Sequence, residues 1–190
     1  EDEQAALRHH IVPRRHLVHM PGIGIDTTRY STAALEPGAP ARARESAGVP
    51  VGAPMFVVVA EHSPRKRAKD AIAALAAMRH SDAHLLLAGE GPELANLERQ
   101  VAELGVGDRV RFLGSVPDVR PVVSAATALI LPSDREGLAR CVMEAMALSV
   151  PAIVSTARGN AELIGDDCGI LVPLGDVAGL AAAMDRLIDH

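Results

Sequence analysis

Aromatic residues are scarce: the 190-residue chain has no tryptophan, one tyrosine and two phenylalanines. Nearly half of the residues, 48%, are nevertheless apolar, so the core has to be built from Ala, Val, Leu and Ile. Such a core suits closely packed helices over a buried sheet. A chain of this length is enough for one domain with a sizeable core and is too short for two large ones.

Neither a large charge imbalance nor a cysteine framework is present. The formal net charge is −5, from 24 acidic and 19 basic side chains, whereas a nucleic-acid binder needs a basic face. We therefore expect no nucleic-acid partner. The two cysteines, Cys141 and Cys168, show no paired spacing, and we interpret them as reduced thiols in a cytoplasmic protein.

The sequence also lacks the segments that direct a protein to or across a membrane. No apolar run approaches the ~18 residues that span a bilayer, and the polar residues 1–9 do not have the pattern of a signal peptide. The chain does not start with Met and opens in the middle of a pattern. We interpret it as a fragment excised from a longer protein.

Several familiar reaction centres are missing as well. The eight histidines form no convincing metal site. His16 and His19 would face opposite sides of a strand or meet only loosely on a helix, with no carboxylate close in sequence. No Gly-x-Ser-x-Gly elbow and no Gly-x-x-x-x-Gly-Lys-Ser/Thr loop occurs, which excludes nucleophile-elbow hydrolases and P-loop NTPases.

From residue 55 onward, the chain alternates regularly between apolar runs and amphipathic stretches. The apolar runs are continuous, as in strands buried on both faces, and cover residues 55–60, 84–88, 110–113, 128–131, 152–155 and 169–172. The expected helices cover residues 69–78, 92–104, 119–126, 138–148, 160–164 and 177–188. This alternation predicts an α/β fold with a Rossmann-like, doubly wound parallel sheet and helices on both faces.

The first 54 residues have a different character. Residues 35–54 are rich in Pro, Gly, Ala and Arg, which predicts a poorly ordered surface connection with one short helix near residues 42–47. Residues 17–20 are a candidate further strand that ends at residues 21–26. We therefore divide the chain into a leading segment, residues 1–54, and a Rossmann-like domain, residues 55–190.

In an open parallel sheet, ligands bind at the carboxyl ends of the strands. After the fourth expected strand the chain reads Glu136-Gly-Leu-Ala-Arg-Cys-Val-Met-Glu144. Gly137 at the helix start would leave backbone N–H groups open to an anion such as a diphosphate, and both carboxylates could bind sugar hydroxyls in one crevice. On spacing alone, two idle surface charges are an equally good interpretation. The apolar neighbours of Glu144 favour a functional role.

Two further loops carry weaker signals. Residues 63–69, Ser-Pro-Arg-Lys-Arg-Ala-Lys, follow the first expected strand and could hold phosphate, although a solvated charge run is as common. Because cations are mildly unfavourable at a helix N-terminus, their presence here indicates a role other than stabilising the helix. Residues 89–92, Gly-Glu-Gly-Pro, share only two glycines with a dinucleotide-binding fingerprint. They argue against NAD and indicate a tight turn beside the ligand.

Together these motifs resemble family 4 of the glycosyltransferases, also described as glycosyl transferases group 1. The two glutamates with seven residues between them, continued by Ala-Met-Ala, are similar to the family's donor-site signature. Other landmarks follow the family's order at residues 21–26, 61–66, 88–92, 110–114 and 169–176. The resemblance implies the C-terminal, donor-binding lobe of a retaining enzyme with the two-lobed GT-B fold. Residues 1–54 would then enter from a missing N-terminal lobe.

Carried over by position, the resemblance implies a role for each site residue. Glu136 would be catalytic, contacting the donor sugar and stabilising an oxocarbenium-like state, and Glu144 would bind the ribose hydroxyls. The other substrate-binding residues would be Lys66 and Arg65 at the diphosphate, Val116 against the base, and the backbone of Gly137, Leu138 and Ala139 around sugar and diphosphate. Such enzymes need no metal or cofactor, because basic groups and a helix N-terminus stabilise the leaving group.

Two residues of this sequence depart from the common family pattern. Glu61 stands where an arginine is usual, as in a subgroup acting in capsule and exopolysaccharide assembly, and Ala139 stands where a proline is usual. We expect transfer of a hexosyl unit from a nucleotide-diphosphate sugar, a UDP-sugar, to a glycan or lipid-linked acceptor bound by the missing lobe. The fragment alone would be inactive. Peripheral membrane contact of the full-length protein stays open, because that surface belongs to the other lobe.

Two other functions remain open from the sequence. One is a UDP-sugar 2-epimerase-like enzyme, which shares the two-lobed architecture. The other is a non-catalytic nucleotide-binding or regulatory domain.

Overall fold

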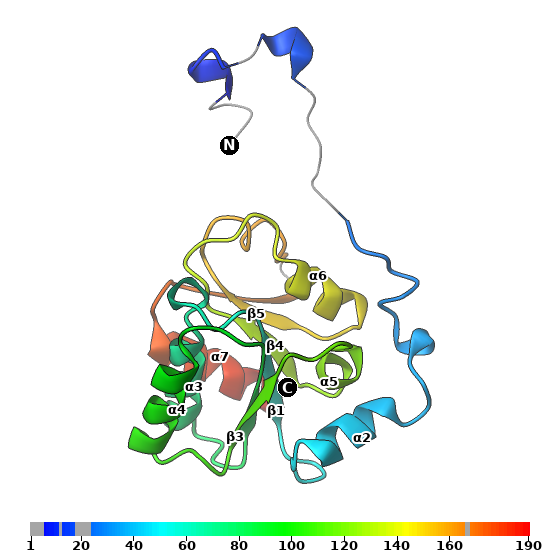
Figure 1. The fold of residues 1–190 in the computed structure, drawn as a ribbon, viewed down its shortest axis with the longest axis vertical. Helices are drawn as coiled ribbons and strands as arrows, with labels where there is room; N and C mark the ends of the chain where they lie inside the picture. Colours follow the sequence, from blue (N-terminus) through cyan, green and yellow to red (C-terminus); the bar gives the residue numbers. More distant parts are fainter. Residues whose placement is uncertain (1–5, 12, 18–23, 166–167) are drawn as a thin grey trace.

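The six strands that the structure describes form one parallel sheet. A computed structural model describes residues 6–11, 13–17, 24–165 and 168–190. The strands are β1 (Met55–Val59), β2 (His84–Ala88), β3 (Val110–Gly114), β4 (Ala128–Leu131), β5 (Ala152–Ser155) and β6 (Gly169–Val172). They pair in the order β3-β2-β1-β4-β5-β6 (Figure 1). The chain therefore winds outward in both directions from β1 and β4, which confirms the predicted Rossmann-like sheet.

Helices cover both faces of this sheet, as predicted. They are α2 (Ala39–Ser46), α3 (Ala68–Ala77), α4 (Leu94–Glu103), α5 (Arg120–Ser124), α6 (Arg140–Ala147) and α7 (Val177–Asp189), with short 3-10 turns η1 (Arg14–His16), η2 (Thr32–Ala34) and η3 (Pro64–Lys66). Phe56 and Val58 of β1 pack in the cluster under α3, α4 and α7. Met55 and Val57 pack in the other cluster, under α2, α5 and α6. Figure 1 shows these three helices on the opposite side of the sheet from α3, α4 and α7. Side chains alternate along a strand, so one apolar run supplies both cores.

The expected elements and the observed ones differ in a few places. The stretch 160–164, predicted to be helical, is a turn, in which Asn160 O accepts hydrogen bonds from the backbone N–H groups of Leu163 and Ile164. Helix α4 begins at Leu94 and α6 at Arg140, each two residues later than predicted. The candidate strand 17–20 lies outside the described residues from position 18 onward.

The connection before β1 is more ordered than its composition suggests. Helix α2 packs against α5, and Ala47, Val49 and Ala53 are buried in the core of that face. Arg44 Nη1 donates to the carbonyl of Ala53 at 2.6 Å, and its Nη2 donates to the carbonyl of Ala125 at 3.3 Å. The expectation of a poorly ordered connection is therefore wrong, because one guanidinium and three small apolar side chains attach this segment to the sheet.

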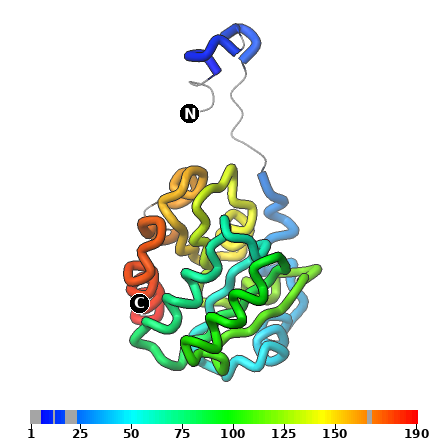
Figure 2. Tube along the Cα trace, turned by 60° about the vertical axis from the view of Figure 1, so that its left-hand side comes forward, coloured from blue at the N-terminus to red at the C-terminus, as the bar shows by residue number. Residues whose placement is uncertain are grey.

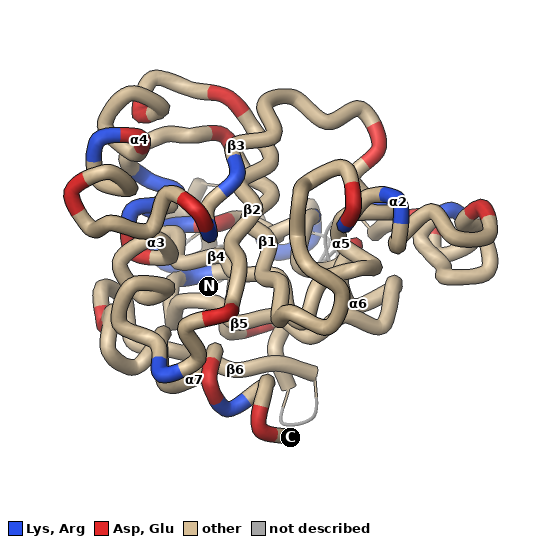
Figure 3. Tube along the Cα trace, turned by 90° about the horizontal axis from the view of Figure 1, so that it is seen from below, with Lys and Arg blue, Asp and Glu red and all other residues tan. Residues whose placement is uncertain are grey.

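Charges of both signs are interspersed over the described surface, as Figure 3 shows for Lys and Arg among Asp and Glu around α2, α3 and α4. Among the described residues, none of the helices combines the length and the apolar composition that crossing a membrane requires.

A carboxylate on α7 holds that helix against the end of α3. Figure 2 shows the path of the backbone from a second direction. Asp185 is 4% exposed and accepts hydrogen bonds from the backbone N–H groups of Arg79 at 3.2 Å and His80 at 3.3 Å. The Arg79 guanidinium pairs with it at 3.3 Å. The buried carboxylate thus satisfies two backbone donors of the turn between α3 and β2.

Replacing Asp185 with Ala should destabilise the domain by about 2–4 kcal/mol, because two partly buried N–H groups lose their acceptor. Asp185→Asn retains one acceptor oxygen and should cost less. Urea unfolding followed by circular dichroism measures both. The matched control is Asp189→Asn on the same helix, where the carboxylate pairs at the surface with Arg79 and His80 and should contribute little. Equal effects of Asp185→Ala and Asp189→Asn would contradict this assignment.

Candidate functional site

The candidate site lies where the order of the sheet reverses. Strands β1 and β4 are neighbours, but the chain leaves β1 toward β2 and leaves β4 toward β5, on opposite sides. Loops that part in this way open a crevice at the carboxyl ends of the strands. A cavity of about 430 Å³ occupies this position and is lined by Val59, Lys66, Glu136, Leu138, Ala139, Arg140, Cys141 and Glu144.

Glu136 is joined across this crevice to the loop after β1. Its Oε1 lies 2.7 Å from Lys66 Nζ and 3.7 Å from Arg65 Nη1, and the residue is only 9% exposed. Arg65 also donates to the carbonyl of Arg135 at 2.7 Å, and its own carbonyl accepts from the N–H of Asp134 at 3.0 Å. The loops after β1 and β4 are thus fastened together by side-chain and backbone bonds.

The cations of the basic loop, residues 63–69, pair with different carboxylates because of the turn in this loop. Lys66 ends η3, and Arg67 takes the left-handed conformation, φ +52°, immediately before α3. Arg67 Nε pairs with Asp70 of the first turn of α3 at 2.7 Å. This pair offsets the unfavourable placement of a cation at a helix N-terminus. Arg65 and Lys66 therefore face Glu136, whereas Arg67 pairs with the first turn of α3.

Glu144 lines the same cavity from the middle of α6. It is 9% exposed, and its Oε1 lies 3.5 Å from Arg140 Nη2, one turn earlier in the helix. Burial, followed by the neighbouring carboxylate of Glu144, raises the pKa of the Tyr30 phenol. The two predicted carboxylates thus meet at one cavity while keeping different partners.

The segment between the two glutamates forms the wall and floor of the cavity. Leu138 and Ala139 line it, and no side chain caps the N-terminus of α6, so its first N–H groups face an open end that suits an anion. Gly137, next to the lining residues in sequence, packs against Gly159. A Cβ at Gly159, whose φ is +87°, would collide with the carbonyl oxygens of Glu136 and Gly137.

A buried polar network lies next to this wall. Asn160 Nδ2 donates to Ser155 Oγ at 3.2 Å, and Ser155 Oγ donates to the carbonyl of Ser133. All three residues are buried. The network connects the end of β5 to the loop that leads into Glu136, and so stabilises the position of that loop.

The two glycines of residues 89–92 are needed for close approach. Gly89 and Gly91 have φ values of +150° and +157°, and a Cβ at either would collide with the backbone of Ala60 or His62. The loop after β2 therefore packs directly on the loop after β1. This agrees with the predicted tight turn.

Most of the predicted site residues come together, and one does not join the cavity. Lys66, Glu136, Leu138, Ala139 and Glu144 line it. Arg65 reaches Glu136 from the rim, with half of its side chain exposed, and Gly137 adjoins the lining. Val116 is half-buried in the loop between β3 and α5 and does not line the cavity.

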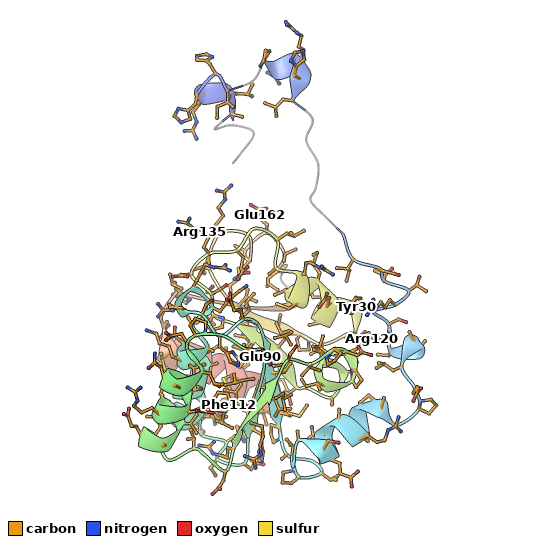
Figure 4. All side chains as sticks on the ribbon, viewed as in Figure 1. Tyr30, Glu90, Phe112, Arg120, Arg135 and Glu162 are labelled. Atoms are coloured by element: carbon orange, nitrogen blue, oxygen red, sulfur yellow. The ribbon has the colours of Figure 1, made fainter. Side chains whose placement is uncertain are left out.

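Sequence reasoning missed four residues of the site. Val59, Arg140 and Cys141 line the cavity, and Tyr30 lies beside α6, where the carboxylate of Glu144 helps to raise its pKa (Figure 4). Arg140 and Cys141 could have been found if the start of α6 had been placed correctly, because the first turn of this helix faces the cavity. No local pattern indicates Tyr30, since only the tertiary fold brings residues 24–34 to α6.

Comparison with known proteins identifies the family of this chain. Residues 41–190 match the family described as glycosyl transferases group 1. The chain belongs to this family. It is 30% identical over 146 residues to the lipopolysaccharide core biosynthesis glycosyltransferase LpsE of Rhizobium meliloti (strain 1021), covering 76% of this chain and 42% of that protein.

Two other matches show how far the likeness extends. The GDP-mannose-dependent alpha-(1-6)-phosphatidylinositol monomannoside mannosyltransferase of Mycolicibacterium smegmatis (strain ATCC 700084 / mc(2)155) is 32% identical over 188 residues, covering 93% of this chain and 48% of that one. The crystal structure of Anabaena Alr3699/HepE in complex with UDP superposes with a TM-score of 0.88 and 25% identity, over 98% of this chain and 51% of that chain. The chain thus spans about half the length of these group 1 relatives.

The thiol of Cys141 offers a probe of the cavity. Burial, reinforced by the carboxylates of Glu136 and Glu144 and opposed by Lys66, raises the pKa of this thiol to about 12. The thiol is therefore protonated in the native protein at neutral pH, although it lines the cavity. The protonated form stabilises the fold below about pH 8.5, the ordinary cysteine pKa, and this contribution is lost as pH rises through the native pKa.

In a Cys168→Ala background, iodoacetamide should alkylate Cys141 slowly in the native protein at about pH 8 and rapidly in urea, where the pKa returns to about 8.5. Mass spectrometry of timed samples measures the two rates, with Cys141→Ala as the unlabelled control. Native labelling as fast as labelling in urea would show that the thiol is not held in its protonated form.

Proposed function

We propose that this chain is the donor-binding half of a retaining glycosyltransferase with GT-B architecture. It binds a nucleotide-diphosphate sugar, a UDP-sugar, whose hexosyl unit passes to a glycan or lipid-linked acceptor in the assembly of a bacterial-type polysaccharide. The observation that carries the proposal is the convergence of Glu136 and Glu144 on one cavity at the switch point of the sheet. Membership of the glycosyl transferases group 1 family supports it.

Each part of the donor has a chemically suitable partner in this arrangement. Glu144 accepts hydrogen bonds from the ribose hydroxyls, and Glu136 accepts them from the sugar, since a carboxylate binds vicinal hydroxyls well. The diphosphate lies between them, at Lys66, Arg65 and the open N-terminus of α6. The base lies against the loop between β3 and α5, which contains Val116.

Donor binding requires one exchange of partners. Lys66 and Glu136 pair with each other at 2.7 Å, so a donor that binds both side chains has to replace this contact. As a donor enters, Lys66 turns to the diphosphate and Glu136 to a sugar hydroxyl. When the bond between the anomeric carbon and the phosphate oxygen breaks, its electron pair stays on the diphosphate, whose charge Lys66 stabilises. The developing positive charge on the sugar lies near Glu136. This proposal requires no metal or cofactor.

The relatives support the donor class and the acceptor class. The HepE structure holds UDP, and LpsE is named for lipopolysaccharide core biosynthesis. The mycobacterial relative is named for GDP-mannose, so a direct comparison of UDP with GDP decides the base.

Isothermal titration of the chain with UDP should show weak binding, with GDP weaker still. Glu144→Gln should raise the dissociation constant about 10- to 100-fold, because a charged hydrogen bond contributes about 1.5–3 kcal/mol. Lys66→Met should weaken UDP and leave uridine binding unchanged, since uridine has no diphosphate. The control is Glu103→Gln, at the surface of α4. GDP binding tighter than UDP, or UDP binding that neither variant changes, would contradict the proposal.

In the complete enzyme, Glu136→Gln should lower sugar transfer strongly while UDP affinity stays close to that of the unmodified protein. The 190-residue chain should transfer little or no sugar, because the acceptor groups belong to the other half. Chromatography of the product from a UDP-sugar and an acceptor measures transfer. Release of a 2-epimerised sugar instead of a glycoside would indicate epimerase chemistry.

A further inference from the structure

Arg140 is the first residue of α6 and lines the cavity at the switch point of the sheet. Its side chain is 69% exposed, and its Nη2 lies 3.5 Å from Glu144 Oε1. Among the residues that the structure describes, this carboxylate is its one hydrogen-bonded or ion-paired partner. A mostly exposed side chain that reaches its partner only at the outer limit of a hydrogen bond is held weakly. The guanidinium can therefore leave Glu144 for another anion at little cost.

The start of α6 is an unfavourable place for a cation without an anion beside it. The N-terminal end of a helix carries a partial positive charge. The N-cap residue Ala139 supplies no side-chain acceptor, and the first turn of α6 contains no acidic residue. At the start of α3, by contrast, Asp70 of the first turn lies 2.7 Å from the neighbouring Arg67. The charge of Arg140 and the positive end of α6 thus both suit an anion that comes from outside the protein.

The charges that line the cavity also favour a second cation for the diphosphate. The lining contains the carboxylates of Glu136 and Glu144 and the cations of Lys66 and Arg140. In the proposed function both carboxylates stay ionised to accept hydrogen bonds from hydroxyl groups, and the diphosphate adds negative charge between them. Lys66 by itself would leave this arrangement negative, and like charges repel strongly at the short distances of a partly buried site. Arg65 approaches only from the rim, 3.7 Å from Glu136.

The two lining cations hold the two carboxylates in parallel ways. Lys66 pairs with Glu136 at 2.7 Å, and Arg140 pairs with Glu144 at 3.5 Å. A diphosphate that attracts both cations leaves both carboxylates to the hydroxyl groups of the donor. Arginine is well suited to this exchange, because its planar guanidinium donates two parallel hydrogen bonds to a phosphate group.

We infer that Arg140 binds the diphosphate of the donor, with its guanidinium moving from Glu144 to the phosphate oxygens. The diphosphate is then held from two elements of the fold: Lys66 contacts it from the loop after β1, and Arg140 contacts it from the start of α6. The same movement releases the Glu144 carboxylate for the ribose hydroxyls, as a second exchange of partners beside that of Lys66 and Glu136. This inference rests on the proposed function, in which the cavity takes a nucleotide-diphosphate sugar.

Titration calorimetry of Arg140→Met with UDP and with uridine separates binding of the diphosphate from binding of the ribose and base. We expect the dissociation constant for UDP to rise about 10-fold, as for loss of one charged hydrogen bond. Uridine, which has no phosphate, should bind no more weakly than it binds to the unmodified chain. Arg140→Lys retains a cation at the same position and should lose less UDP affinity than Arg140→Met.

The matched control is Arg135→Met, which removes the same charge from an exposed position in the loop that leads into α6, outside the lining of the cavity. This variant should bind UDP as tightly as the unmodified chain, since its side chain does not face the diphosphate. Equal losses of UDP affinity in Arg135→Met and Arg140→Met would reduce the effect to net charge and would overturn the inference.

The inference is also overturned, and the proposed function stands, if Arg140→Met binds UDP as tightly as the unmodified chain while Glu144→Gln binds it more weakly. Equal weakening of UDP and uridine by Arg140→Met overturns it as well, since the arginine would then act on the ribose through Glu144. The same holds if Arg140→Lys loses as much UDP affinity as Arg140→Met. Failure of the unmodified chain to bind either UDP or GDP would overturn the proposed function and this inference together.

Discussion

The ion pair between Lys66 and Glu136 is the contact on which the site depends. It joins the loops after β1 and β4, which leave the sheet in opposite directions, and both side chains are largely buried. A buried pair of this kind contributes little net stability, because removing two charges from water offsets their attraction. Its importance lies in placement. It holds one cation and one carboxylate at the mouth of the crevice. A charged ligand can there take the place of one member of the pair and bind the other.

The two glutamates are similar in chemistry and differ in their surroundings. Glu136 lies in a loop, faces a cation and is supported from behind by the carbonyl of Arg158, which accepts its backbone N–H at 3.2 Å. Glu144 lies inside a helix and pairs with an exposed arginine one turn earlier. An ion-paired carboxylate on a loop can change partners, whereas the backbone of a residue inside a helix stays in place. In the function that we propose, this difference suits the reacting sugar at Glu136 and the unchanging ribose at Glu144.

The segment before β1 contributes more than a connection. Its residues 24–34 bring Tyr30 to α6, and its residues 39–53 fill the core under α5 through α2 and three buried small side chains. The face of the sheet that carries α6 therefore depends on residues from the start of the chain. Docking of that segment and the geometry at Glu144 are consequently linked, since both rest on the packing around α5 and α6.

The sequence by itself determined the sheet, the alternation of helices and the grouping of Lys66, Glu136 and Glu144. The apolar runs that form the strands are local patterns, and the rule that ligands bind at carboxyl ends turns strand positions into a site. Only the tertiary structure decided where α6 begins, that residues 160–164 turn without forming a helix, that α2 packs on α5, and that Tyr30 lies beside α6. Periodicity and turn chemistry act over a few residues. A contact between segments far apart in the chain exists only after the sheet has brought them together.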